Sequence, residues 1–415
     1  MTAERRAALC AAAAAISVAE APQRLRLLTF TTLYPNAAQP THGVFVETRL
    51  RQLVGTGRAT STVLAPVPWF PIASPRFGVW GLHAAAPRHE ERHGLSVHHP
   101  RFAALPRIGM SISPFSLYLA AAGALARMIA DGLRVDAIDA HYLYPDGVAA
   151  VRLGRRFRLP VVLTARGSDT SLLPRYAVPR RLIQGAVAGA DGIIAVSAGI
   201  KDALIGLGAA PDKVAVLRNG VDLDAFRPVA DRAGLRAELG LGSAPTLLSV
   251  GHLIERKGHD LIIEALPSLP GHVLMVVGDG PERQCLLAQA ERLGVTARVR
   301  LLGAQPQAKL PQFYTAADAL VLASSREGWA NVLLEAMACG TPVVASPAWG
   351  SREAVSSPAA GLVLEERSPQ AIAAGVLRLL GSPRDRDATR AHAARFGWDE
   401  TSAGQLEVFH RVLAP

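Results

Sequence analysis

Two glutamates, Glu327 and Glu335, stand in the segment SREGWANVLLEAMACGTPVVAS at residues 325–346. The first follows an apolar run that ends near Ser324, and the second falls in a helical pattern that begins near Val332. The first N–H groups of a helix have no partner inside it and attract anions, while a carboxylate accepts hydrogen bonds from vicinal hydroxyls. The spacing suggests hydroxyls at Glu327, phosphate at the helix start and a ribose at Glu335. A capping acid and a solvated surface acid are the alternative.

A second stretch, SVGHLIERKGHDLIIEAL, places Arg256 and Lys257 between a strand that ends at Gly251 and a helix that begins near His259. Cations and free N–H groups beyond the carboxyl end of a strand suit a phosphate. The turn at residues 278–281, Gly-Asp-Gly-Pro, repeats this geometry and lets a ligand approach the backbone. A solvated charged turn and an ordinary strand–helix turn remain the alternatives.

Two further groups follow neighbouring strands in the first half of the chain. His141 ends the strand pattern in DAIDAHYLYPDG, and Arg166 and Asp169 follow the next one in LTARGSDTSLLP. His141 could face a ligand or be a buried structural histidine. Arg166 and Asp169 could bind an acceptor molecule or form a structural ion pair.

Strand patterns alternate with helical patterns along the chain. Strands are expected at residues 25–30, 61–67, 135–141, 160–166, 192–197 and 214–219, and again at 246–251, 272–278, 298–303, 319–324, 342–345 and 361–364. Helices are expected at 45–54, 115–131, 147–157, 180–188, 259–266, 283–293, 310–316, 332–338 and 369–380. Such alternation predicts parallel sheets covered on both faces, and two series predict two doubly wound α/β domains facing a cleft.

The expected domains are residues 24–222 and 223–395, joined where the strand pattern is lost between Gly220 and Pro245. Residues 1–23 form an alanine-rich leader that only partly imitates a secretory signal, and a start codon placed too far upstream would also explain them. Residues 66–114, rich in proline, histidine and arginine, are expected to form irregular loops beside the cleft. Residues 396–415 are expected to form a helix that packs back on the first domain.

Composition narrows the function classes. The formal net charge is +10, but all 44 basic residues except Lys201, Lys213, Lys257 and Lys309 are arginines, and no arginine run is interleaved with aromatics. This pattern argues against nucleic acid as a partner. The cysteines at 10, 285 and 339 are too scattered for a disulfide framework or a metal cluster, so no metal is expected. No apolar run reaches the roughly 18 to 20 residues that span a bilayer, so a soluble globular chain is expected. The expected location is the cytoplasm, with a peripheral position on the inner face of the membrane as the alternative.

The motifs together resemble glycosyltransferase family four, the group 1 type of retaining, nucleotide-sugar-dependent enzymes with the GT-B fold. The resemblance rests on the E-x7-E of REGWANVLLEAMACGTPVVAS, on SVGHLIERKGHDLIIEAL, on VSAGIKDALIGLGAAPDKVAVLRNGVDLDAFRP and on the blocks LLGAQPQAKLPQFYTAADALVLASSREG and WGSREAV. It covers roughly residues 24 to 400. It implies an acceptor-side first domain and a donor-binding second domain, as in bacterial exopolysaccharide or cell-envelope enzymes.

Carried over residue by residue, the resemblance assigns roles within the site. His141, Glu327 and Lys257 would be catalytic: His141 polarises the reacting centre, Glu327 sits beside the donor sugar and Lys257 binds the diphosphate. Other donor contacts would come from the residues Gly43, Arg256, Gly278, Asp279, Gly280, Gly328, Trp329, Ala330, Asn331, Val332 and Glu335. Trp329 is bulkier than is common there and could narrow the sugar pocket. The family's usual arginine after Gly251 is His252 here, for which Arg256 could substitute.

The function implied is transfer of a sugar, with retention, from a UDP- or GDP-sugar to a glycan or lipid-linked acceptor, with no other cofactor. The insertion at residues 66–114 carries aromatic and basic side chains that could contact a membrane or such an acceptor, and loose surface loops are the alternative. Two rival functions stay open. One is a GT-B-fold nucleotide-sugar epimerase, and the other is a non-catalytic nucleotide-sugar-binding protein.

Overall fold

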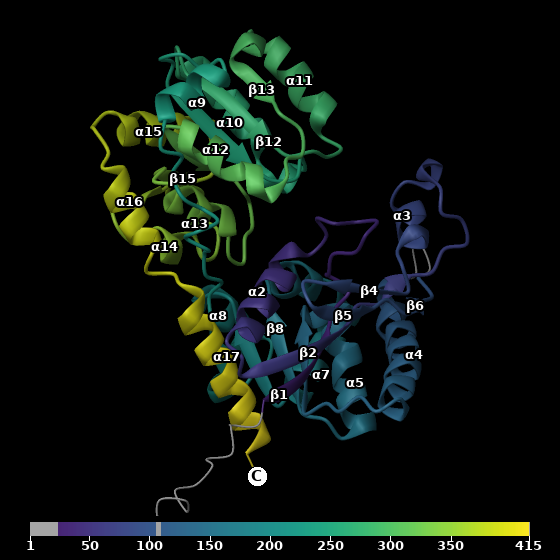
Figure 1. Ribbon diagram of the computed structural model, residues 1–415. Helices are drawn as coiled ribbons and strands as arrows, with labels where there is room; N and C mark the ends of the chain where they lie inside the picture. The colour runs from purple at the N-terminus through teal and green to yellow at the C-terminus, as the bar shows by residue number, and fades with distance from the viewer. Residues whose placement is uncertain (1–23, 105–108, 415) are drawn as a thin grey trace, which may run out of the picture.

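The computed structural model describes residues 24–104 and 109–414, so the expected leader lies outside the described residues. Two sheets dominate these residues, each covered by helices on both faces and each in its own domain (Figure 1). The predicted fold class, two Rossmann-like α/β domains, is confirmed.

The N-terminal domain is built on an eight-stranded sheet with the order β10-β9-β8-β7-β1-β2-β5-β4, parallel except for β4. Its strands are β1 (Leu25–Phe30), β2 (Ala59–Leu64), β4 (His89–Arg92), β5 (Leu95–His98), β7 (Ala137–His141), β8 (Val161–Ala165), β9 (Gly192–Ala195) and β10 (Val214–Val216). Its helices are α2 (Val44–Gly55), α3 (Val79–Ala85), α4 (Gly109–Ala130), α5 (Val148–Phe157), α6 (Ser168–Ser171), α7 (Ala177–Gly189) and α8 (Ala198–Gly206). The central strands β7, β8 and β9 are buried at every position, as expected of a parallel sheet covered on both faces.

The C-terminal domain has a six-stranded parallel sheet with the order β13-β12-β11-β14-β15-β16. Its strands are β11 (Thr246–Val250), β12 (Val273–Val277), β13 (Val299–Leu301), β14 (Ala319–Leu322), β15 (Val343–Ala345) and β16 (Gly361–Val363). Its helices are α9 (Arg232–Glu238), α10 (His259–Ala265), α11 (Arg283–Arg292), α12 (Leu310–Ala316), α13 (Asn331–Ala338), α14 (Ser351–Ala354), α15 (Pro369–Leu380) and α16 (Arg386–Ala393). Because β11 and β14 are neighbours, the loops that follow them lie side by side at one edge of the sheet.

The last helix, α17 (Trp398–Leu413), returns to the N-terminal domain (Figure 1). Its buried side chains Leu406, Val408 and Phe409 share one apolar cluster with Leu25 and Leu27 of β1. The chain therefore crosses between the domains twice.

The expectation that residues 66–114 form irregular loops is wrong for much of the segment. β5 pairs with β2, β4 pairs with β5, and a two-stranded sheet joins β3 (Val67–Pro68) to β6 (Arg101–Phe102). These strands have only two to four residues and are rich in histidine and arginine, so they lack the apolar run that marks the central strands.

The expectation that no apolar run is long enough to span a bilayer is also wrong by length and composition. Residues Ser111–Ala130 of α4 have a mean hydropathy of 1.4, and a third of that stretch (33%) is buried inside the protein. The helix packs against α5, α7 and β6 of the N-terminal domain. The core helix of a globular domain passes the same test, so this is weak evidence for a span.

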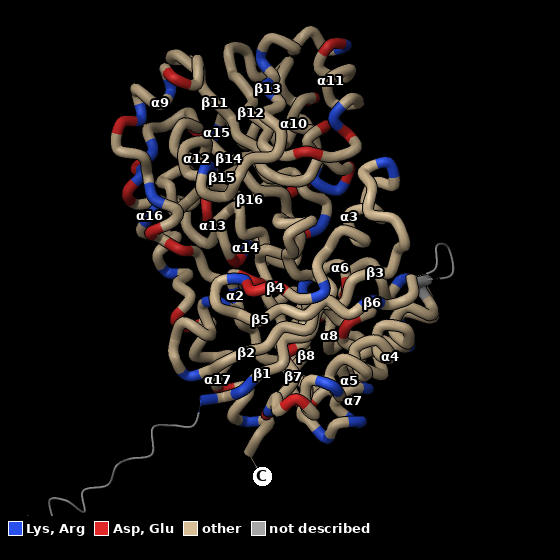
Figure 2. Tube along the Cα trace, turned by 45° about the vertical axis from the view of Figure 1, so that its right-hand side comes forward, with Lys and Arg blue, Asp and Glu red and all other residues tan. Residues whose placement is uncertain are grey.

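Charged residues are spread over both domains. In the view of Figure 2, basic and acidic residues are both scattered over the two lobes. The net charge of +10 is therefore not gathered into one basic face in this view.

Candidate active site

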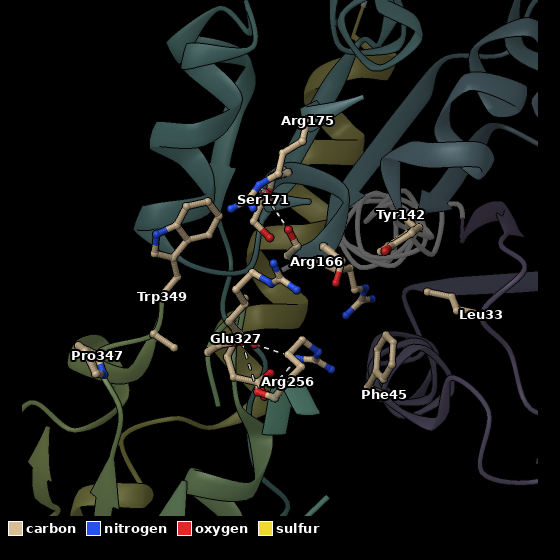
Figure 3. Close-up of a pocket in the computed structure, with 17 residues that line it drawn as sticks. Leu33, Phe45, Tyr142, Arg166, Ser171, Arg175, Arg256, Glu327, Pro347 and Trp349 are labelled. Carbon is tan, nitrogen blue, oxygen red and sulfur yellow. Dashed lines mark hydrogen bonds and ion pairs between the residues drawn. The ribbon is translucent and has the colours of Figure 1, made fainter. Parts of the chain in front are cut away.

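A pocket of about 660 Å³ lies between the two domains. Its N-terminal wall consists of Leu33, Phe45, Tyr142, Arg166, Gly167, Ser168, Thr170, Ser171 and Arg175 (Figure 3). Its C-terminal wall consists of Arg256, Ser325, Arg326, Glu327, Gly328, Pro347, Ala348 and Trp349 (Figure 3). Both walls come from loops beyond the carboxyl ends of strands, where open parallel sheets bind ligands.

On the C-terminal wall, the loops after β11 and β14 bring together the cations and the carboxylate that the sequence singles out. The backbone N–H of Ser325 donates to the Arg256 carbonyl at 2.8 Å, which holds the two loops together. Lys257 Nζ lies 2.6 Å from Glu327 Oε1, and Arg256 Nη1 lies 3.5 Å from the same oxygen. The Glu327 side chain is only 11% exposed, so this ion pair is partly shielded from water. The arrangement offers a carboxylate that can accept hydrogen bonds from hydroxyl groups, together with cations that suit a phosphate.

Glu335 lies about one turn into α13 and has a different environment. The Tyr314 hydroxyl donates to Glu335 Oε2 at 2.6 Å. Burial raises the pKa of the Glu335 carboxyl to about 7, and the hydrogen bond from Tyr314 opposes that rise. The two glutamates of the E-x7-E motif therefore differ in charge: Glu327 is in an ion pair, and Glu335 titrates near neutral pH.

The start of α13 lies beside the point where the two domain backbones touch. Ala330, which precedes the helix, provides no side-chain cap, so among the described residues no N-cap side chain bonds to the first N–H groups of α13. One turn earlier in the chain, a Cβ on Gly328 would overlap the Arg166 carbonyl across the pocket, and Gly167 faces Gly328 in return. Glycine is required at 328 for this close approach.

On the N-terminal wall, His141 ends β7 and is 1% exposed. Arg166 Nη2 donates to His141 Nδ1 at 2.9 Å. Because a guanidinium only donates, Nδ1 must be the acceptor and the imidazole proton is on Nε2, which lies 3.2 Å from Asp139 Oδ2. Burial lowers the pKa of His141, so the ring is neutral at pH 7. His141 is not among the residues that line the pocket; it lies behind Arg166.

Arg166 connects His141 to the pocket. Its guanidinium stacks over the Phe45 ring at 5.0 Å from the ring centroid. Burial lowers the pKa of Arg166 to about 10, so it remains a cation at neutral pH. Arg166 can therefore contact a ligand in the pocket while its hydrogen bond fixes the position of His141.

Asp169, expected to bind an acceptor or to form an ion pair, forms no ion pair within 4.0 Å in the described part of the chain and is not among the residues that line the pocket. It is fully buried and accepts backbone N–H groups from Leu143 at 3.0 Å, Arg166 at 3.1 Å and Gly167 at 2.7 Å. The carboxylate shapes the loop that carries Arg166. Its contribution to the pocket is therefore indirect.

Trp329, which the sequence pointed to as a group that could narrow the sugar pocket, is not among the residues that line the pocket. Trp329 is 7% exposed, and its ring packs against Phe396 at a centroid distance of 5.8 Å. The tryptophan on the pocket wall is Trp349, whose ring lies against Gly199 of α8. Its segment, WGSREAV, was noted in the sequence, but no signal in it marked the side chain as facing a ligand.

Gly43 and residues 278–280, which were also predicted as donor contacts, lie outside the pocket lining. Gly43 precedes α2 with φ of 70° and is buried against the backbone of Leu33, so packing alone requires a glycine there. Residues 278–280 follow β12 with partial or full exposure, and His252 is exposed after β11. Arg256 reaches the loop of Glu327, where it also donates to the Arg326 carbonyl at 2.8 Å. Whether it replaces the missing arginine at 252 stays a prediction.

Sequence reasoning missed Asp139, Arg49 and the pocket residues Phe45, Arg175 and Arg326. For Asp139 a signal existed, because it lies two positions before His141 on one strand and therefore on the same face. For Arg49 the signal was its position in α2 among the buried residues Val46, Leu50 and Leu53.

Two Rossmann-like domains that enclose a cationic pocket define the architecture of GT-B glycosyltransferases. The comparisons with known proteins place the chain within that class. The model described as "Glycosyl transferases group 1" matches residues 231–396, and the one described as "Glycosyltransferase Family 4" matches residues 78–225. The chain belongs to this family, glycosyltransferase family 4 of the group 1 type, which confirms the resemblance drawn from its motifs.

Similar curated proteins are named D-inositol 3-phosphate glycosyltransferase. The one from Frankia alni is 35% identical over 307 residues, which cover 68% of this chain and 75% of that protein. The one from Xylanimonas cellulosilytica is 34% identical over 298 residues, covering 66% and 71%. The one from Mycobacterium tuberculosis is 36% identical over 219 residues, covering 50% and 45%.

Solved structures share the fold at lower identity. Sucrose-phosphate synthase from Thermosynechococcus elongatus superposes with a TM-score of 0.76 at 19% identity, over 94% of this chain and 99% of that one. Anabaena HepE in complex with UDP superposes with a TM-score of 0.68 at 22% identity, over 94% and 100%. These two similarities support the fold alone.

Proposed function

We propose that this protein transfers a sugar, with retention, from a nucleotide diphosphate sugar to an acceptor hydroxyl bound in the interdomain pocket. The observation that carries the proposal is the meeting of Lys257 and Glu327 at 2.6 Å at the edge of that pocket, directly before the uncapped start of α13. The site would hold diphosphate near Lys257 and the helix start, the donor sugar at Glu327 and the ribose at Glu335. His141 would act through Arg166, behind the acceptor.

In the proposed reaction, the bond between sugar C1 and the diphosphate oxygen breaks while the acceptor oxygen bonds to C1 on the same face. The proton of the acceptor hydroxyl passes to the departing diphosphate. Lys257 and the N–H groups of α13 stabilise the negative charge that develops there, which is the kind of electrostatic assistance that dominates many enzymes. No further cofactor is part of the proposal.

The donor is proposed to be a UDP- or GDP-sugar. HepE of Anabaena, which shares the fold, was solved with UDP and with UDP-glucose, and this supports UDP first. The sugar itself is left to a donor panel.

For the acceptor, the pocket favours a molecule with an anionic group. Four arginines line it, Arg166, Arg175, Arg256 and Arg326, against the single carboxylate of Glu327. The relatives named for D-inositol 3-phosphate point to the same chemistry. A lipid-linked glycan acceptor with a diphosphate also carries such an anionic group, and this would fit a role in polysaccharide or cell-envelope synthesis.

One assay separates this proposal from the two rivals. Purified protein is incubated with UDP- and GDP-sugars, with and without inositol phosphate or a lipid diphosphate sugar, and nucleotide release is measured together with the product sugars. Acceptor-dependent release of UDP or GDP supports the transferase. An epimerised donor formed without acceptor would support the epimerase, and donor binding without turnover across the panel would support the binding protein.

Contact with a membrane is a second proposal, favoured by one patch. The side chains of Trp69, Ile72, Phe77, Val79 and Leu82 are each 41% to 58% exposed, around the short helix α3. Figure 1 shows α3 standing out from the N-terminal domain above α4 and β6. Sedimentation with anionic vesicles tests the proposal: Trp69→Ser with Leu82→Ser should abolish binding, whereas Leu377→Ser, an exposed leucine of α15, should not.

A further inference from the structure

Three polar side chains link helix α2 of the N-terminal domain to the start of α13 in the C-terminal domain. Arg49 Nη1 donates to the Leu217 carbonyl at 3.0 Å and to Asn219 Oδ1 at 3.0 Å. Asn219 Nδ2 donates in turn to Asn331 Oδ1 at 3.1 Å. The asparagines of the chain are Asn36, Asn219 and Asn331, and two of them meet here.

Arg49 is an unusual residue for a helix interior facing a sheet. It is 0% exposed, and among residues 24–104 and 109–414 it takes part in no ion pair within 4.0 Å. Its Nε and Nη2 atoms have no hydrogen-bond partner in that part of the chain. Burying a cation without a paired carboxylate costs stability, so a benefit outside folding is a reasonable expectation.

Arg49 determines how both asparagine amides are turned. A guanidinium has only donors, so the Asn219 atom that faces it must be the carbonyl oxygen. The other end of that amide is then the NH₂ group, and the Asn331 atom facing it must again be a carbonyl oxygen. The Nδ2 group of Asn331 takes no part in this series of hydrogen bonds, so its two N–H donors can face a ligand. Without such a cation, either orientation of each amide would be open.

Asn331 is the first residue of α13, beside the uncapped N–H groups of its first turn. An asparagine turned the other way would present its carbonyl oxygen instead of its N–H groups. We propose that Arg49 and Asn219 are positioning residues that turn the Asn331 amide so that its N–H₂ group joins the helix N–H groups in binding the donor diphosphate. This inference rests on the proposed function, because it names a further ligand of the same diphosphate.

The chain of bonds also crosses from one domain to the other. In Figure 1, α2 lies on the side of the N-terminal domain that faces the C-terminal domain, and α13 lies in the lower part of the C-terminal domain. The orientation of Asn331 is therefore set only when the two domains are together, which couples diphosphate binding to domain closure.

The test compares UDP with uridine, measured by calorimetry on the full chain, with GDP and guanosine in parallel. Asn331→Ala should weaken diphosphate binding roughly 5- to 10-fold, and Asn331→Asp, which replaces the donors with an oxygen, roughly 100-fold. Nucleoside binding should stay unchanged in both. Asn219→Ala should match Asn331→Ala, and adding it to Asn331→Ala should cause no further loss. Gln289→Ala, which removes an amide bonded to the Asp260 carbonyl elsewhere in the domain, is the control.

Two results would overturn the inference while leaving the proposed function intact. One is wild-type diphosphate affinity in Asn331→Asp, which stays informative if the buried Asn219→Ala variant fails to fold. The other is an equal loss of nucleoside and diphosphate binding, since that would reflect general damage to the site. A wild-type protein that binds none of the nucleotides would remove both proposals.

Discussion

The two walls of the pocket use charge in opposite ways. On the C-terminal wall, Lys257 forms an ion pair with Glu327, whose side chain lines the pocket. On the N-terminal wall, Arg166 lines the pocket and is hydrogen-bonded to the buried His141, which lies beside the buried Asp139, with the cation of Arg49 nearby. A charge that lines the pocket can exchange its protein partner for a ligand, whereas buried groups such as His141 and Asp139 hold a geometry. The difference suggests that the C-terminal wall binds the donor and the N-terminal wall positions the reaction.

The largest effect is expected from the C-terminal wall. Glu327→Ala and Lys257→Ala should each lower transfer about 100- to 1,000-fold or more, because each removes charge at the donor sugar or its leaving group. Steady-state transfer to a fixed acceptor measures this, and the midpoint of thermal unfolding should change little. Lys309→Ala, at an exposed lysine of the same domain, is the matched control. Full activity in either site variant would contradict the assignment of this wall.

A smaller effect with a different signature is expected from the N-terminal wall. His141→Ala removes the acceptor of the Arg166 hydrogen bond, so the guanidinium loses its fixed position over the pocket. We expect kcat to fall about 10- to 100-fold with an unchanged Kd for UDP, since displacement of a positioning group costs rate more than donor affinity. Calorimetry with UDP beside steady-state kinetics separates the two. A loss of UDP affinity as large as the loss of kcat would break the contrast between the walls.

The pH dependence of nucleoside binding sharpens the comparison within the C-terminal wall. Burial raises the pKa of Glu335 from its ordinary value of 4.5 to about 7, and ribose hydroxyls bind best to the ionised carboxylate. Uridine affinity should therefore rise about tenfold between pH 6 and pH 8 in the wild type. In Glu335→Gln it should be flat. Equal pH profiles for the two proteins would exclude Glu335 as the ribose ligand.

The raised pKa of Glu335 should also make the stability of the protein depend on pH. Between pH 4.5 and about 7 the folded protein keeps a proton on Glu335 that the unfolded chain has released. The free energy of unfolding should therefore fall as the pH rises through this window. Denaturant titrations should show a weaker dependence in Glu335→Gln. A steeper fall in the variant would mean that other groups dominate the window.

The sequence was informative where a residue's position depends on its own strand and helix. Glu327, Lys257 and His141 could be placed because each follows a buried apolar run at the edge where parallel strands bind ligands. The contact between Lys257 and Glu327 could not be predicted, because it depends on β11 and β14 being neighbours in the sheet, and a single sequence does not state strand order. The two domains were predictable from the alternation of apolar runs, whereas β4 and β5 were not, since four polar-rich residues carry little periodic signal.

The sequence also could not predict the direction in which a side chain points, as the tryptophans Trp329 and Trp349 show. Substitution of Trp329 is expected to have the smallest effect on activity. Trp329 packs behind the pocket against Phe396, and its Nε1 has no hydrogen-bond partner among the described residues, so Trp329→Phe loses neither a bond nor a pocket contact. Preference across a panel of donor sugars should therefore change by no more than about twofold. Trp349→Phe, on the pocket wall, should shift the acceptor KM several-fold instead, since it shrinks a ring that lies between the pocket and α8. If the donor preference changed in Trp329→Phe and nothing changed in Trp349→Phe, the indole of Trp329 would have to move to the donor when it binds, and the C-terminal wall would be more mobile than its ion pair suggests.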